Sequence, residues 1–93
     1  MKDRLEIVPV NEFKKQEQDL LRDIAHWCYT HSTELDKKEI AKNIFNALEY
    51  GKVDLQVRYL RSIRAVFAEY REAYPDRAKE SRKLQERIKE LIE

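Results

Sequence analysis

The sequence predicts an all-α protein: a small bundle of three main helices, with a charged C-terminal helix and a short extended N-terminal arm. Two observations lead to this class. The 93 residues include only one glycine and two prolines, so long helices with short connections are expected. Apolar residues also recur every three or four positions along three segments, which is the spacing of one face of an α-helix.

The composition indicates one small domain, which we expect to be cytoplasmic. Leu, Ile, Val and Phe supply 24 of 93 residues, enough to form a core. Nineteen basic and eighteen acidic side chains leave a net charge of +1, which disfavours wholesale wrapping of nucleic acid or adhesion to an acidic membrane. A single cysteine excludes an internal disulfide and fits a reducing compartment. The apolar runs are too short for a membrane span or a signal peptide.

Residues 1–10 are expected to form an extended arm. The segment RLEIVPV, residues 4–10, is rich in β-prone residues, but Pro9 cannot donate a hydrogen bond to a sheet. The arm is expected to lie over the helices. The alternatives are a frayed tail, or an edge strand that pairs with a partner or with a second copy.

Residues 11–75 are expected to form the three-helix core, and the first helix runs from Asn11 to about His31. Its apolar residues fall on one stripe, and charged residues occupy the positions between them. The stripe consists of Phe13, Leu20, Leu21, Ile24, Trp27 and Cys28.

The second helix has the clearest local signals in the chain. Asp36 can cap its start, and Glu39 can close a capping box three residues later. Leu35 can pack against Ile40 as a hydrophobic staple. Gly51, the only glycine, marks the expected end, where a left-handed residue is commonly needed.

The third helix is expected to begin at Asp54 as its cap and to break at Pro75. Proline lacks a backbone donor and pushes the preceding residue, Tyr74, out of helical geometry. The predicted buried face consists of Leu60, Ile63, Val66, Phe67, Tyr70 and Tyr74.

Residues 76–93 form the expected charged C-terminal helix, in which eleven of eighteen residues carry a charge. Its narrow apolar seam consists of Leu84, Ile88, Leu91 and Ile92. The seam is too short for an independent coiled coil, so the helix must dock on the body of the same chain or on a partner. A second copy bound along this seam would make a homodimer.

Arginines gather on one side of the third helix. Arg61, Arg64 and Arg71 share one flank, and none of them has an acid three or four residues away. Arg58 projects elsewhere and has Asp54 four residues before it, the favourable order for an ion pair. The charge of the three flank arginines must therefore be met by acids of neighbouring helices, by phosphates, or by an acidic patch on a protein partner.

The sequence offers no catalytic, metal or cofactor site that we would assign. One glycine cannot build a phosphate-binding loop. Cys28 and His31, three residues apart, are the only pair of nucleophile and base, and Cys28 lies on the apolar stripe. With His26 they make an incomplete metal-ligand set on one helix. No small-molecule substrate is indicated.

These observations favour a non-enzymatic interaction or regulatory protein that acts through helix faces, with a homodimer as one form. The expected partner is a protein with an acidic patch or a second copy of the chain. The residues expected to contact a partner or phosphate are Arg58, Arg61, Arg64, Arg71 and Lys52. The alternative is a nucleic-acid-binding protein of helix-turn-helix type, with Gly51 in the turn. Tyr50 and Tyr59 are the tyrosines expected nearest to the surface.

Overall fold

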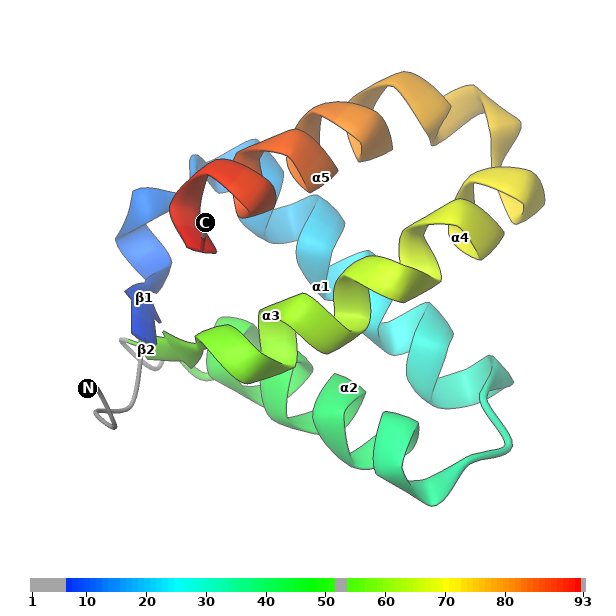
Figure 1. Ribbon diagram of the computed structural model, residues 1–93, viewed down its shortest axis with the longest axis horizontal. Coiled ribbons are helices and arrows are strands. Elements are labelled where there is room, and N and C mark those ends of the chain that lie inside the picture. The colour runs from blue at the N-terminus through cyan, green and yellow to red at the C-terminus, as the bar shows by residue number, and fades with distance from the viewer. Residues whose placement is uncertain (1–6, 52–53, 93) are drawn as a thin grey trace.

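In the computed structural model, which describes residues 7–51 and 54–92, the chain is an all-α bundle with a short extended arm (Figure 1). The α-helices are α1 (Lys15–His31), α2 (Leu35–Glu49), α3 (Val57–Ile63), α4 (Phe67–Ala73) and α5 (Ala78–Ile92). Two short strands, β1 (Ile7–Pro9) and β2 (Asp54–Gln56), and three 3-10 turns, η1 (Val10–Glu12), η2 (Arg64–Val66) and η3 (Pro75–Arg77), complete the described elements.

The first helix starts later than predicted, at Lys15 rather than at Asn11. Residues 10–12 form η1 instead, because nearby side chains satisfy the backbone of this turn. The Gln18 amide donates to the carbonyl oxygen of Phe13 at 2.9 Å, and Glu17 Oε1 accepts the Lys14 backbone N–H at 2.7 Å.

The capping box and the staple predicted for the second helix are wrong. Helix α2 begins at Leu35 with Glu34 as its N-cap, and no side-chain hydrogen bond caps it. Ser32 Oγ accepts the Glu34 N–H at 3.2 Å. This hydrogen bond lies in the connection before α2, earlier in the chain than the cap predicted at Asp36. Leu35 is 78% exposed, so it forms no staple. The predicted stop is confirmed, since Gly51 follows the helix with φ +70°.

The predicted cap at Asp54 is also wrong, because Asp54 belongs to strand β2 and Gln56 is the N-cap of α3. Strand β2 pairs antiparallel with β1, with Val8 opposite Leu55 and Pro9 opposite Asp54. Val8 and Leu55 are buried. The described part of the arm, residues 7–10, therefore lies on the body of its own chain by strand pairing, and residues 1–6 fall outside the described residues.

The predicted third helix is divided into α3, η2 and α4, which follow one another without an intervening loop. Its predicted break is confirmed. Tyr74 leaves helical geometry at φ −131° and ψ 75°, and Pro75 opens the turn η3 that leads into α5. Tyr70 is buried as predicted, whereas Tyr74 is exposed.

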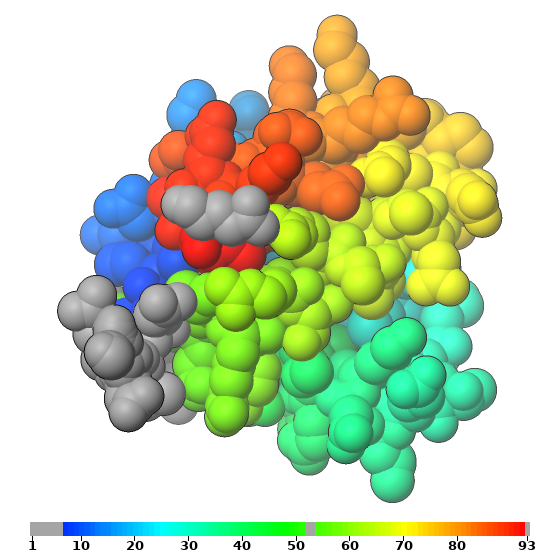
Figure 2. Space-filling model, viewed as in Figure 1, coloured from blue at the N-terminus to red at the C-terminus, as the bar shows by residue number. Residues whose placement is uncertain are grey.

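Helix α5 docks on the body of its own chain. It contacts α1, α3 and α4, and Leu84 and Ile88 are 1% and 0% exposed (Figures 1 and 2). These two side chains belong to the same core cluster as Phe67, Leu60 and Ile24. No helix in the described part of the chain has the length and apolar character that crossing a bilayer requires.

Candidate functional site

Cationic side chains lie along α5 and along the segment from α3 to α4, and α5 contacts both α3 and α4. Arg71 of α4 contacts Gln85 of α5, and Arg82 and Lys89 lie three residues before and four after Gln85, so they share its side of α5. Arg64 lies two helical turns before Arg71, and Arg61 one turn earlier still. We call this surface the basic face; it consists of Arg61, Arg64, Arg71, Arg82 and Lys89. Figure 2 shows α5 and α3–α4 meeting along one side of the molecule.

Arg71 is held by a neutral group. Its Nη1 donates to Gln85 Oε1 at 2.7 Å, and the side chain is half-buried. An amide oxygen satisfies one guanidinium N–H and fixes the side chain, but it does not cancel the positive charge. The charge of Arg71 therefore remains at the surface between the two helices.

Other arginines of the chain do find carboxylates. Arg22 lies 3.3 Å from Glu49, Arg77 lies 3.0 Å from Asp23, and Arg87 pairs with Glu17 and Glu90. Among the described residues, no carboxylate forms such a pair with Arg61, Arg71, Arg82 or Lys89. Arg61, Arg82 and Lys89 are exposed, and Arg64 is half-buried beside them. Arg61, Arg71, Arg82 and Lys89 thus differ from the arginines that hold the fold together through carboxylates.

The Arg77 site shows the structural role that an arginine takes elsewhere in the chain. Its Nη1 donates to Asp23 Oδ2 at 3.0 Å and to the Tyr70 hydroxyl at 2.8 Å. The hydrogen bond with Asp23 raises the pKa of Arg77, and burial raises the pKa of Tyr70. This network ties the start of α5 to α1 and α4, so it supports the docking of the C-terminal helix.

Two further residues were predicted to contact a partner or phosphate, Arg58 and Lys52, and neither is placed on the basic face. Arg58 Nε donates to Gln56 Oε1 at 3.0 Å, and its guanidinium lies 5.1 Å from the centre of the Tyr59 ring. The predicted pair with Asp54 is replaced by these contacts, because Asp54 is in a strand rather than one turn earlier in the helix. Lys52 falls outside the described residues.

The predicted self-association seam needs correction at its first two residues. Leu84 and Ile88 are covered by the body of the same chain, so they are not presented to a second copy. Leu91 and Ile92 are half-buried and pack against the same core. The seam is apolar because it docks α5.

Cys28 and His31 line the same pocket at the end of α1, and His26 is not among the described residues that line it. The His31 ring stacks on Trp27 at 4.7 Å, and its Nδ1 lies 3.0 Å from the Trp27 carbonyl oxygen, whereas the His26 ring packs against Phe45 at 5.7 Å. Cys28 is 4% exposed, and burial raises the pKa of its thiol. Such a thiol is a poor nucleophile at neutral pH. In residues 7–51 and 54–92, no group of three or more potential metal ligands comes together.

The joint between α2 and α3 differs from a helix-turn-helix. Residues 50–56 separate the two helices and include strand β2, whereas that motif uses a turn of about three or four residues. Comparison of the chain with protein-family models, with curated proteins and with solved structures gave no match. The site must therefore be interpreted from its own chemistry.

The sequence prediction named Arg61, Arg64 and Arg71 of the basic face and did not name Arg82 and Lys89. Their positions around Gln85, on one flank of the Leu84 and Ile88 stripe, were a usable signal. The sequence did not show that this side of α5 lies beside the arginine flank of α3–α4. That arrangement depends on the direction in which α5 folds back after Pro75.

Proposed function

We propose that this chain is a non-enzymatic interaction protein whose basic face binds an acidic surface of a partner protein. The observation that carries the proposal is the Arg71–Gln85 contact at 2.7 Å, with Arg82 and Lys89 on either side of it. Five cationic groups lie on adjacent helices, and a neutral amide positions the central one without neutralising it.

An acidic protein fits this face better than a nucleic acid. The net charge of the chain is only +1, so phosphates approaching outside the basic face would meet many carboxylates. Glu72 and Glu86 are exposed on the same helices and border the basic face by their helical positions. A partner with a compact acidic patch can contact Arg61, Arg71, Arg82 and Lys89 and avoid this border, whereas a long polyanion cannot.

The expected binding is weak and sensitive to salt. Exposed ion pairs contribute about 0.2–1 kcal/mol each, so pairs with Arg61, Arg71, Arg82 and Lys89 supply roughly 1–4 kcal/mol. Contacts with Ala68 and with the aliphatic parts of the arginines must add the remainder. We expect dissociation constants in the micromolar range or weaker at physiological ionic strength.

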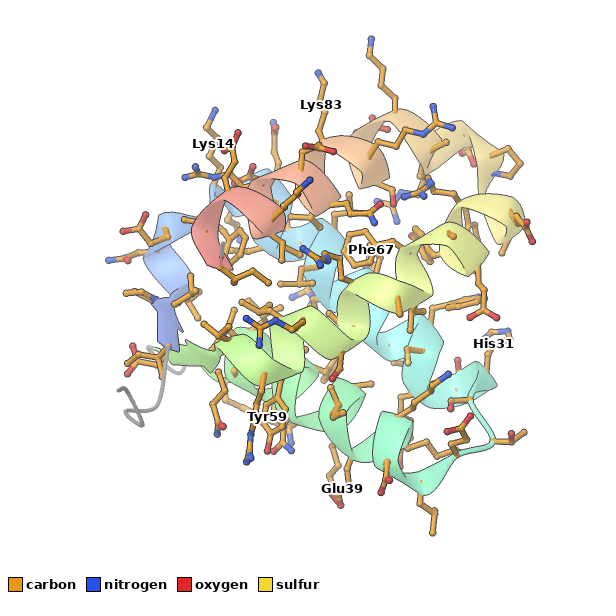
Figure 3. All side chains as sticks on the ribbon, viewed as in Figure 1. Lys14, His31, Glu39, Tyr59, Phe67 and Lys83 are labelled. Atoms are coloured by element: carbon orange, nitrogen blue, oxygen red, sulfur yellow. The ribbon has the colours of Figure 1, made fainter. Side chains whose placement is uncertain are left out.

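The proposal can be tested with two defined probes, a fluorescent 20-residue helical peptide with glutamates on one face and a mixed-sequence 20-base-pair duplex. Binding of each probe is measured by anisotropy over a series of salt concentrations. The test variant carries Arg61→Gln, Arg71→Gln and Arg82→Gln. The control variant removes the same charge from other faces with Lys15→Gln, Lys42→Gln and Lys83→Gln; Lys83 projects from α5 away from α4 (Figure 3).

The test variant should lose about 1–3 kcal/mol of peptide binding, roughly a 5- to 150-fold weaker affinity, while the control variant stays within about threefold. Equal weakening by both variants would mean that only net charge matters, and it would contradict the proposal. Tighter binding to the duplex, with a salt slope of about −0.9 per contacted phosphate, would favour the nucleic-acid alternative instead.

A further inference from the structure

A groove of about 420 Å³ opens on the side of α3 opposite the basic face. It lies between α2 and the segment formed by β2 and the first turn of α3. Tyr59 points into this side of the molecule, away from the Phe67 side of the core (Figure 3). The polar and aromatic residues that line it are Asn43, Asn46, Tyr50, Asp54, Gln56 and Tyr59.

The groove is lined by side chains that suit a polypeptide backbone. Asn43 Nδ2 donates to the Glu39 carbonyl oxygen at 3.0 Å, which leaves Asn43 Oδ1 as an acceptor. Gln56 Oε1 accepts from Arg58 at 3.0 Å, which leaves its Nε2 as a donor. Asn46 forms no side-chain hydrogen bond with the described residues, so its amide offers both functions. Tyr50 is 74% exposed and adds an aromatic surface at the rim.

Among the described residues, strand β2 has no partner strand on the edge that lies away from β1, and Asp54, Leu55 and Gln56 line the groove. The only partner strand of β2 in the described residues is β1, where Pro9 lies opposite Asp54. Pro9 has no N–H and cannot exchange two hydrogen bonds with Asp54, so the hydrogen-bonded pair is Val8 with Leu55. In an antiparallel ladder the backbone groups of successive residues alternate between the two edges. The N–H groups of Asp54 and Gln56 therefore face away from β1, and α2 lies on that side (Figure 1).

We propose that this groove binds an extended segment of a partner protein, which adds to β2 as a third strand. Three residues of β2 offer an edge of about 10 Å, enough for three or four residues of the incoming peptide. Among the described residues that line the groove, Asp54 is the only charged one, and it forms no ion pair with the described residues. The bound segment accordingly carries a lysine or arginine at the position facing Asp54. This site is distinct from the basic face and takes a ligand of opposite charge.

The probe for this site is a phage-displayed library of random heptapeptides, selected on the full chain, from which enriched peptides are synthesised and their affinities measured. Two variants at one position separate the backbone from the side chain. Gln56→Pro removes the outward N–H at a residue whose φ of −77° already suits proline, and Gln56→Ala keeps the N–H and removes the side chain. Far-ultraviolet circular dichroism and thermal unfolding check that both variants fold.

Enriched peptides should contain a basic residue and should bind Gln56→Pro at least tenfold more weakly than Gln56→Ala. Asp54→Asn should weaken them about threefold or more, and the triple arginine variant should bind them as well as the wild type does. A second measurement needs no variant of the protein. N-methylation at every second backbone nitrogen of the peptide should abolish binding, whereas N-methylation at the nitrogens between them should be tolerated.

Three results would overturn the inference: no enrichment, equal binding to Gln56→Pro and Gln56→Ala, or tolerance of methylation at every nitrogen. Loss of peptide binding in the triple arginine variant would also overturn it, because the peptides would then occupy the basic face. The proposed function would stand in each of these cases, since its own test uses an acidic probe.

Discussion

Replacing Leu84 by alanine tests whether α5 is held by its own chain. Leu84 is 1% exposed and lies in the same core cluster as Phe67 and Ile88. The substitution removes three buried carbon groups, which at about 0.8 kcal/mol each costs roughly 2.4 kcal/mol of transfer free energy. The cavity left behind adds to this, so a total of about 3 kcal/mol is expected, within the usual 2–5 kcal/mol range.

A loss of this size is large for a chain of 93 residues. At about 0.05–0.15 kcal/mol per residue, the unfolding free energy lies between about 5 and 14 kcal/mol. Urea denaturation followed by circular dichroism measures the change, and the melting temperature should fall by about 12–24 °C. The matched control is Leu35→Ala, the same chemical change at a side chain that is 78% exposed, which should alter stability by less than about 0.5 kcal/mol.

Protein concentration provides the decisive comparison. If Leu84 packs within the monomer, the stability lost in Leu84→Ala is the same at every protein concentration. If Leu84 instead formed a seam between two copies, the loss would depend on concentration, because association contributes by mass action. A concentration-dependent loss, or a loss below about 1 kcal/mol, would refute the docking of α5 described above.

Three further predictions concern the backbone, a buried hydroxyl and a buried thiol. Gly51→Ala should cost about 1 kcal/mol and lower the melting temperature by about 4–8 °C, and an unchanged melting temperature would contradict this. Apart from Gly51 and its two chain neighbours, no described atom lies within 4 Å of the added carbon, so the expected cost comes from strain at φ +70°. Ser81→Ala should leave stability unchanged or raise it by about 1 kcal/mol, because Ser81 Oγ is buried without a hydrogen-bond partner among the described residues; a clear loss in urea denaturation would show that the hydroxyl is satisfied. Burial raises the pKa of Cys28 above its ordinary value of 9.0, so above pH 9 the folded state keeps a proton that the unfolded state loses. The free energy of unfolding should therefore be independent of this thiol below pH 9 and should fall as the pH rises further, less steeply in Cys28→Ala. An equal fall in both proteins would argue against a buried thiol.

The helical segments and their buried faces could be predicted from local patterns. The break at Pro75 and the stop at Gly51 follow from the backbone restrictions of single residues, and both are confirmed. The start signals were less reliable. Asp36 and Asp54 have the chemistry of caps, but Ser32 organises the chain before α2, and pairing with β1 draws Asp54 into a strand. A cap signal is local, and these two positions were decided by contacts with more distant residues.

For the candidate surfaces, too, local spacing could be predicted and contacts between distant residues could not. The absence of acids within one helical turn of Arg61 and Arg71 was visible in the sequence, because neighbours on a helix are fixed by a spacing of three and four residues.

By itself the sequence determined the helices, the break before α5 and the arginine flank, since these depend on periodicity and on the chemistry of individual residues. The tertiary structure decided that α5 folds back onto α1, α3 and α4, which buries Leu84 and Ile88 and brings Arg82 and Lys89 beside Arg71. It also decided that β2 pairs with β1 and borders a groove. The physical reason is that an apolar stripe indicates only that one face of a helix must be buried. The element that covers this face is determined by the packing of the whole chain that buries the most apolar surface.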